Sequence, residues 1–321
     1  MNVVITGARG QDGTLLRQLL VSQGHRVLGI VRTRGGSIDS GAAEDIAVDL
    51  CDSTALSRVI AEFRPDQWYH LAACHHSSEQ SGDPGTDSEM VRTNFLSVEI
   101  LLSLLLKMRP QCRLLVTGSS QMYSRTPGRR ILVDEETTMA PSTFYGQTKT
   151  WSRELLHHYR ARRGMFASMA ILFNHESVLR QPVFLSRKTT QAVARISEGQ
   201  QTELVIQDAD AEVDWSSARD VVNGMRLMLT ADQPADFVLA SGQARRVADL
   251  LEVAFRHAGL EWRTHVRSQS PKTSTTAGVL VGNPQKAEQT LGWQRLDSFE
   301  DLIREMVTHD RRLLREQAVT N

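Results

Sequence analysis

The sequence has no excess of charge of either sign. Lysine plus arginine and aspartate plus glutamate both number 37 among its 321 residues. Chains that bind nucleic acid generally carry a strong basic bias, so this balance argues against a nucleic-acid partner. The longest apolar run, ILLSLLL at residues 100–106, is too short to span a membrane. The start, MNVVITG, lacks the basic segment and long apolar run of a signal peptide. We therefore expect no membrane partner.

Cysteine is also scarce. Cys51, Cys74 and Cys112 are scattered without metal-ligand spacing, so we expect neither a disulfide framework nor a metal site. The small, odd count is typical of a reducing, cytoplasmic setting. We find no internal repeat and no low-complexity segment, and the length allows one large domain or two smaller ones. The composition thus favours a soluble cytoplasmic globular enzyme.

Strand-like and helix-like segments alternate along the first half of the chain. Short apolar runs predict strands at 2–6, 26–32, 44–50, 67–73 and 113–118, and helical spacing of apolar residues predicts helices at 14–25, 52–63 and 90–108. This alternation predicts an α/β fold, a Rossmann-like doubly wound parallel sheet. We expect this domain to cover residues 1–173, with 202–230 returning to it. A smaller, interleaved C-terminal α/β lobe at 174–321 would bind substrate.

The first predicted strand-to-helix turn is rich in glycine. TGARGQDG places Gly7, Gly10 and Gly13 at three-residue steps. Glycines there let the backbone and a helix N-terminus approach a pyrophosphate, so we expect a dinucleotide site. The pattern alone is weak, and its place in an alternating chain strengthens it. The alternative is an ordinary glycine-rich turn.

The second strand ends in VRTR, without the acid that would bind the ribose hydroxyl of NAD. Arg32 and Arg34 offer guanidinium groups that can pair with a 2′-phosphate, so NADP is favoured over NAD. The alternative is that these arginines only face solvent. Asp49 and Leu50, at the end of the third strand, are placed to flank the adenine, although an Asp there can also be a helix cap.

A hydroxyl-rich strand end and a tyrosine–lysine pair could move a proton. VTGSSQMYS, residues 116–124, carries Ser119 and Gln121, and FYGQTK carries Tyr145 and Lys149. Four-residue spacing puts the last two on one face of a helix, where a cationic lysine would lower the pKa of the phenol. Such a tyrosine could take a proton from an alcohol while hydride leaves for a nicotinamide. By itself the Y-x-x-x-K pair is more often structural, and the dinucleotide turn makes the combination specific.

With these motifs the chain resembles the extended short-chain dehydrogenase/reductases, and among them the GDP-mannose 4,6-dehydratases. The resemblance covers nearly the whole chain and is carried by ITGARGQDG, YHLAA, FYGQTK, ILFNHES, SRKTTQAVARI, ARDVVNGMRLML and LGW. It implies oxidation at the sugar C4, loss of water from C5 and C6, and return of hydride to C6. The catalytic positions it implies are Ser119, Gln121, Tyr145 and Lys149. The cofactor positions it implies are Gly7, Gly10, Gln11, Asp12, Gly13, Arg32, Asp49, Leu50, Leu71, Ala72, Ala73, Tyr145, Lys149 and His175.

One catalytic position departs from the family. Gln121 stands where the resemblance implies a glutamate base, and an amide cannot accept the C5 proton. The site could therefore act at C4 without elimination, as a 4-ketoreductase, 4-dehydrogenase or epimerase. Alternatively, His75, His76 or Glu79 of HHSSEQ could supply the base, although a loop histidine is more often a surface residue. A third possibility is a cofactor-binding protein without turnover.

The substrate positions are only partly kept. Val213 stands where the family has a phosphate-binding arginine, and a second arginine has no match because residues 268–278 form a shorter loop. His76, Asn174, Arg180 and Lys188 are the candidate contacts for a nucleotide sugar, which we expect to be GDP-linked. The Arg180 and Lys188 region could equally be a solvated charge cluster. The apolar faces of helices 90–108 and 145–163 suggest a homodimer or homotetramer, or else simply face the core.

Overall fold

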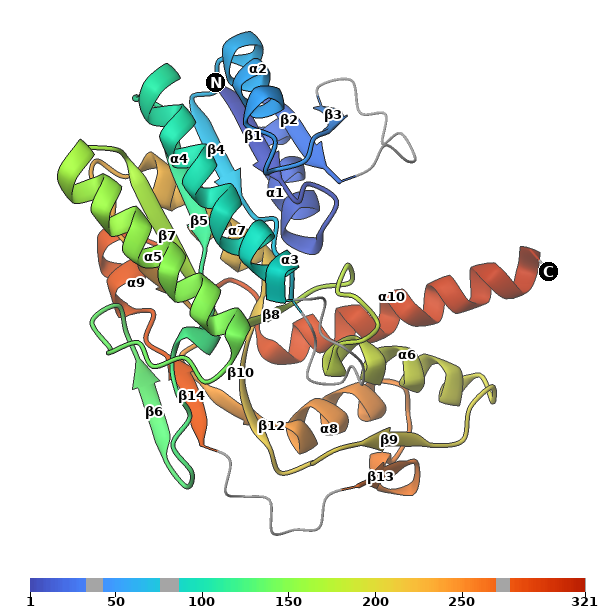
Figure 1. Ribbon diagram of the computed structural model, residues 1–321. Coiled ribbons are helices and arrows are strands. Elements are labelled where there is room, and N and C mark those ends of the chain that lie inside the picture. Colours follow the sequence, from blue (N-terminus) through green and yellow to red (C-terminus); the bar gives the residue numbers. More distant parts are fainter. Residues whose placement is uncertain (33–42, 76–86, 270–277, 321) are drawn as a thin grey trace.

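A computed structural model describes residues 1–32, 43–75, 87–269 and 278–320 of the chain. Its main element is a seven-stranded sheet in the order β11-β7-β5-β4-β1-β2-β3, with every neighbouring pair parallel (Figure 1). The strands are β1 (Asn2–Thr6), β2 (Arg26–Val31), β3 (Ala43–Ala47), β4 (Gln67–His70), β5 (Arg113–Thr117), β7 (Ala167–Leu172) and β11 (Phe237–Leu239). The strand order reverses between β1 and β4, and doubly wound sheets bind ligands at the carboxyl ends of such strands.

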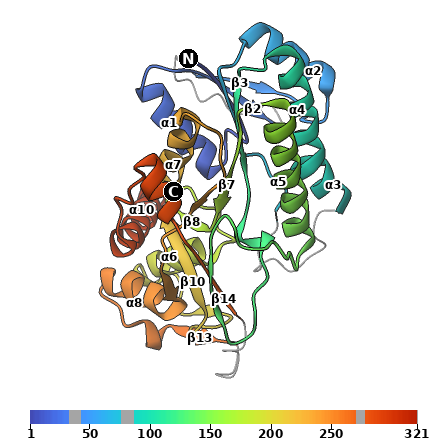
Figure 2. The same cartoon turned by 90° about the vertical axis from the view of Figure 1, so that its left-hand side faces the viewer.

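Helices cover both faces of this sheet (Figure 2). One face carries α1 (Gln11–Ser22) and α7 (Ala218–Thr230), and the other carries α2 (Ser53–Phe63), α4 (Ser97–Met108) and α5 (Phe144–Arg163). This arrangement confirms the fold class that the alternating pattern predicted. The inner strands β1, β4, β5 and β7 are buried on both sides, so most of their residues are apolar, whereas the edge strand β3 is partly exposed.

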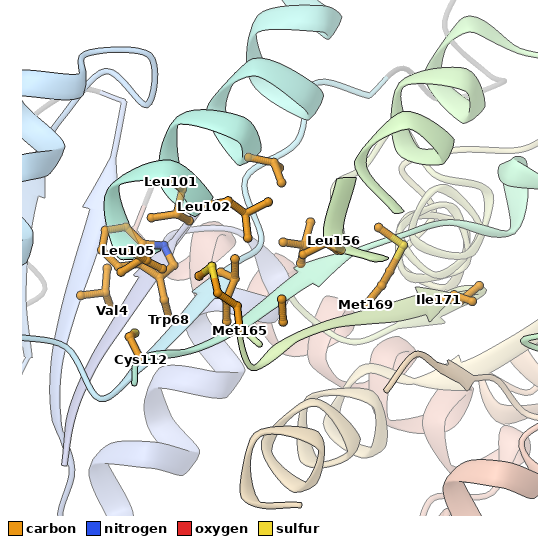
Figure 3. Packing of buried hydrophobic residues seen from close by; sticks show 14 of the residues in the cluster. Val4, Trp68, Leu101, Leu102, Leu105, Cys112, Leu156, Met165, Met169 and Ile171 are labelled. Atoms are coloured by element: carbon orange, nitrogen blue, oxygen red, sulfur yellow. The ribbon is translucent and has the colours of Figure 1, made fainter. Parts of the chain in front are cut away.

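The strands feed two apolar cores, one on each face. Val4 belongs to one cluster and its neighbours Val3 and Ile5 to the other, as the period-two alternation of a strand requires. In the first cluster, Trp68 of β4 and Leu101 of α4 are 0% and 1% exposed (Figure 3). Burying one such large side chain stabilises the fold by about 1.5–3 kcal/mol.

The helix expected over 90–108 is present and contains a π-helical segment. It consists of α3 (Asp87–Val91), a five-residue π-helix η1 (Arg92–Leu96) and α4. The Ser97 hydroxyl donates to the carbonyl of Thr93, four residues earlier, inside this wider turn. A π-turn cannot be read from apolar spacing, because it shifts the register by only one residue.

The remaining elements form the second lobe. It contains a sheet of β12 (Ala244–Arg246), β10 (Glu212–Ser217) and β8 (Asn174–Glu176), and the strand pairs β13–β9 (Val266–Ser268 with Leu204–Ile206) and β14–β6 (Val279–Gly282 with Arg130–Val133). Its core lies between α6 (Leu185–Ser197), α8 (Val247–His257) and α10 (Phe299–Thr320). Shorter elements are α9 (Gln285–Leu291) and the 3₁₀ turns η2 (Ser120–Met122) and η3 (Trp262–Thr264).

The expected domain boundary near residue 173 stays a prediction. Within the segment 202–230, β9 pairs with β13 in the second lobe, whereas α7 packs against α1 on the large sheet. β11, further along the chain, also joins that sheet beside β7. None of the helices in the described part of the chain is both long enough and apolar enough to cross a membrane.

Candidate active site

The turn between β1 and α1 forms a cradle of backbone. Gly7 has φ +72°, a conformation that strains any residue with a side chain. A Cβ on Gly13 would lie 2.4 Å from the Gly7 carbonyl oxygen, so nothing larger than glycine fits there. α1 begins at Gln11 with Gly10 as its N-cap, so no capping side chain covers its first N–H groups. These residues fit the pyrophosphate of a dinucleotide.

The next side chains tie this turn to the second lobe. Gln11 Nε2 donates to the carbonyl of His175 at 3.0 Å, and Asp12 lies 3.0 Å from the His175 ring. Burial raises the pKa of Asp12, but the charge of His175 outweighs it, and the pKa lies below its ordinary value. Burial lowers the pKa of His175, but the Asp12 carboxylate outweighs it and raises the pKa overall. The two residues therefore form an ion pair between α1 and β8.

Tyr145 and Lys149 lie one turn apart at the start of α5. The Lys149 ammonium is 1% exposed, donates to the Thr117 carbonyl at 2.8 Å and lies 5.8 Å from the centre of the Tyr145 ring. Burial lowers the pKa of Lys149 to about 8. Burial also raises the pKa of Tyr145, while a hydrogen bond with the Ser119 hydroxyl opposes that rise.

The expectation that Lys149 lowers the pKa of Tyr145 is therefore wrong for this structure. Loss of water around the phenol dominates, and the group that opposes it most is Ser119. The Lys149 ammonium is committed to the end of β5 through Thr117. The four-residue spacing of Tyr145 and Lys149 cannot reveal how deeply the fold buries the two side chains.

The Gln121 amide contacts both Thr143, at the start of α5, and His75, after β4. Its Oε1 accepts a hydrogen bond from the Thr143 hydroxyl at 3.0 Å, and its Nε2 lies 3.1 Å from His75 Nε2. Thr143 is also the N-cap of α5 and accepts from the Gly146 N–H at 3.0 Å. The His75 ring stands edge-on to Tyr145, with 4.6 Å between ring centres. Gln121 is thus positioned by the cap of the helix that carries Tyr145 and Lys149.

One cavity of about 310 Å³ brings most of these groups together. Among the residues expected from the sequence to form the site, it is lined by Gly7, Gly10, Gln11, Asp12, Gly13, Leu71, Ala73, Ser119, Gln121, Tyr145, Asn174, His175 and Arg180. It opens at the carboxyl ends of β1, β4 and β5, where the strand order reverses. A cavity lined by a glycine-rich backbone cradle, a phenol and hydroxyl groups suits a dinucleotide beside an alcohol.

A family model described as GDP-mannose 4,6 dehydratase matches residues 4–306 of the chain. The chain is 33% identical to GDP-mannose 4,6-dehydratase of Sinorhizobium fredii, with 97% of each chain covered. It is 32% identical to GDP-mannose 4,6 dehydratase 1 of Arabidopsis thaliana, over 98% of this chain and 91% of that one. The chain belongs to the GDP-mannose 4,6-dehydratase family. It is an enzyme of the short-chain dehydrogenase/reductase type that modifies nucleotide sugars, and NAD(P) is the cofactor typical of this family.

Solved structures share the fold of this family member at lower identity. UDP-glucose 4-epimerase of Thermotoga maritima superposes with a TM-score of 0.83 at 18% identity, over 98% of this chain and 100% of that one. RMD of Pseudomonas aeruginosa, complexed with NADPH, gives 0.80 at 18% identity and the same coverage. These likenesses support the fold class.

The other residues that the sequence predicted for the site do not line this cavity. Arg32 is exposed directly after β2, and Asp49 is exposed and paired with Arg92 at 3.1 Å. Lys188 is half-buried in the first turn of α6. Leu50, Ala72 and Lys149 also do not line the cavity. His76, Glu79 and Arg34 lie outside the described residues.

Three further residues shape the site of this enzyme. They were not identified from the sequence. Thr143 holds Gln121, Phe184 lines the cavity, and Asn94 binds the backbone of Cys74, next to His75. Thr143 could have been found, because a threonine before a predicted helix is a typical N-cap. Asn94 and Phe184 had no such signal, since their roles arise from contacts across the fold.

Proposed function

We propose that this enzyme uses NADP to oxidise C4 of a GDP-linked hexose, with GDP-mannose as first candidate, and then eliminates water between C5 and C6. The observation that carries the proposal is that Ser119, Tyr145 and the glycine turn line one cavity, with Lys149 buried one turn from Tyr145. The full-length similarity to the GDP-mannose 4,6-dehydratases supports the sugar and the nucleotide.

The residues supply proton transfer and position. Bound NADP would accept hydride from C4 and later return it at C6. The Tyr145 oxygen takes the proton of the C4 hydroxyl, and its hydrogen bond to Ser119 favours the ionised phenol. The Lys149 ammonium, buried one helical turn away, is held at the end of β5 by its bond to the Thr117 carbonyl. The resulting ketone at C4 acidifies the hydrogen on C5, which a base must then remove.

The end of β2 supports NADP over NAD. The Gly7 N–H donates to the Ile30 carbonyl at 3.1 Å, so the strand end that carries Arg32 lies beside the glycine turn. Arg32 is exposed there and can pair with a 2′-phosphate. The nearby Asp45, an acid that could bind a ribose hydroxyl, is already paired with Arg9 at 3.0 Å and with Arg17.

A second candidate is an oxidoreductase or epimerase that acts at C4 without elimination. It is favoured by Gln121, because we infer that this amide replaces the glutamate base that the resemblance implies. The Gln121 Oε1 is already hydrogen-bonded to Thr143, and an uncharged amide does not take a proton from carbon. This candidate keeps the roles of Tyr145 and Ser119.

We further propose that the protein forms a homodimer or homotetramer through α4 and α5. Leu96, Met108 and Phe144, at the ends of these helices, are 39%, 37% and 37% exposed. Exposed apolar side chains on neighbouring helices are a common feature of subunit contacts. Sedimentation analysis of the protein and of Leu96→Glu tests this state, and a monomeric wild type would contradict it.

Mass spectrometry of GDP-mannose incubated with the enzyme and NADP in heavy water tests the reaction. A product lighter by one water and carrying deuterium at C5 supports 4,6-dehydration. A product changed by two hydrogens, with no loss of water, supports the second candidate. An epimerase leaves the mass unchanged, so the chromatographic retention of the sugar is measured as well. No change in either mass or retention with any GDP-linked or other nucleotide-linked hexose would refute both candidates.

A further inference from the structure

The proposed dehydration needs a base for the C5 proton. C5 is bonded to C4, so the base must lie beside the group that acts at C4, which is Tyr145. Gln121 lies there but is an amide. The structure must therefore be searched for another proton acceptor within the same cavity.

Few titratable side chains line the described part of the cavity. Asp12 and His175 bind each other, Arg180 is always cationic, and Tyr145 is used at C4. His75 is the remaining one, and it also lines the cavity. Its ring lies edge-on to Tyr145 at 4.6 Å and stacks on Phe184 at 6.1 Å, measured between ring centres.

The bond to Gln121 indicates which form of His75 is present. The Thr143 hydroxyl donates to Gln121 Oε1, which leaves the amide nitrogen facing His75 Nε2 at 3.1 Å. An amide nitrogen can only donate, so His75 Nε2 accepts and carries no proton. The imidazole is thus neutral, with its proton on Nδ1, and holds a lone pair at Nε2. A glutamate at position 121 would instead favour the protonated imidazole.

The backbone before His75 is firmly held. Asn94, 1% exposed in the π-helix η1, accepts from the Cys74 N–H at 2.8 Å and donates to the Cys74 carbonyl at 3.0 Å. The same amide nitrogen donates to Thr148 of α5 at 3.2 Å. The backbone of Cys74, next to His75, is therefore fixed relative to the helix that carries Tyr145. π-Turns are frequent at functional sites, where they re-aim side chains.

We propose that His75 is the base that removes the C5 proton, in a site where Gln121 keeps it neutral; this inference rests on the proposed dehydration. His75 Nε2 displaces its bond to Gln121 and takes the proton from C5. The electron pair of the C5–H bond forms the C5–C6 double bond, and the C6–O bond breaks. The departing hydroxide takes the proton from His75 and leaves as water.

Gln121 assists the second half of this transfer. After proton uptake, the Nε2–H of His75 and the N–H of Gln121 are both donors and cannot bond to each other. Because Thr143 holds the amide in this orientation, the imidazolium is destabilised where it formed. The proton is therefore passed on to the leaving oxygen rather than retained. Gln121 is in this view a positioning residue.

The test compares two rates in the full chain with GDP-mannose and NADP in heavy water. One rate is hydride loss from C4, followed by absorbance of the reduced cofactor, and the other is entry of deuterium at C5. His75→Phe keeps a ring against Tyr145 but has no proton acceptor, and we expect the ratio of C5 exchange to C4 hydride loss to fall at least about 100-fold. His75→Asn is the second variant. His158→Asn, an exposed histidine on α5, is the matched control and keeps both rates.

A carboxylate should rescue the loss. Adding Gln121→Glu to His75→Phe places an acid at the adjacent position, and we expect C5 exchange to return to within about tenfold of wild type. Exchange in both His75 variants within about threefold of wild type, at equal C4 hydride loss, would overturn the role of His75 and leave the dehydration standing. A wild type that oxidises C4 with neither exchange nor loss of water would overturn the dehydration itself. NADP binding, measured by fluorescence, verifies that each variant is folded.

Discussion

Asp236 holds the catalytic helix to the sheet, and its removal gives a large, calculable loss of stability. The carboxylate lies just before β11 and is 3% exposed. It accepts from Arg153 Nε at 2.8 Å, Arg160 Nη2 at 2.5 Å and His157 Nε2 at 2.7 Å, all on α5. It also accepts from the Met169 N–H of β7 at 3.2 Å. Since α5 carries Tyr145 and Lys149, this cluster positions the site.

Asp236→Ala leaves the Arg153 guanidinium, whose side chain is 9% exposed, without its buried anion. Removing one partner of a buried ion pair costs about 3–5 kcal/mol. The bond to His157, whose side chain is 49% exposed, adds little because solvent screens it. The remaining bond from Arg153 to the Glu135 carbonyl at 2.6 Å does not replace the lost charge. We therefore expect the free energy of unfolding to fall by about 3–5 kcal/mol.

The pH dependence of the loss distinguishes this carboxylate from other groups. Burial raises the pKa of Asp236, but the hydrogen bond from His157 and the charge and hydrogen bond of Arg160 outweigh it, so the pKa falls well below the ordinary 3.8. A lowered pKa in the folded state contributes stability that is complete above the ordinary pKa. That contribution is lost as the pH falls through the folded value. The difference between wild type and Asp236→Ala should thus stay constant from about pH 7 to about pH 5 and shrink only in stronger acid.

Urea unfolding followed by circular dichroism at several pH values measures this difference. Glu154→Ala, an exposed acid next to Arg153 on α5, is the control, and its effect should stay within about 0.5 kcal/mol. A difference for Asp236→Ala below about 1 kcal/mol at neutral pH would refute the reasoning. A difference that already declines between about pH 7 and about pH 5 would assign the effect to another group.

Three further changes test the site. Tyr145→Phe removes the proton acceptor at C4 and should slow hydride loss at least about 100-fold in stopped-flow absorbance; a loss below about threefold would exclude this role. Gly13→Ala puts a Cβ 2.4 Å from the Gly7 carbonyl. The strain of about 1–3 kcal/mol should weaken NADP binding about 5- to 150-fold in a fluorescence titration, and unchanged affinity would contradict the cradle. Arg32→Ala removes a charged hydrogen bond worth about 1.5–3 kcal/mol. It should weaken NADP about 10- to 150-fold but not NAD, and an equal loss for both cofactors would argue against a 2′-phosphate contact.

The sequence was sufficient wherever neighbouring residues set the outcome. Apolar runs and helical spacing located the strands and helices of the large sheet, because period-two and 3.6-residue patterns reflect which face each element buries. Gly7, Gly10 and Gly13 predicted a close backbone approach, and the Cβ positions in the folded chain agree with it. The pattern could not reveal η1, since a π-turn leaves the apolar residues nearly in register.

The chemistry of the site depends on contacts that only the tertiary structure creates. Asp12 meets His175 across 163 residues, and Gln121 meets His75 across 46. The pKa of Tyr145 is raised because the fold removes water from it, whereas its spacing from Lys149 suggested the opposite. Local sequence thus determined the helices and strands and their succession along the chain, because each one depends on which of its faces is apolar. The tertiary structure decided which polar groups share a cavity, because desolvation and hydrogen bonding act between segments far apart in the chain.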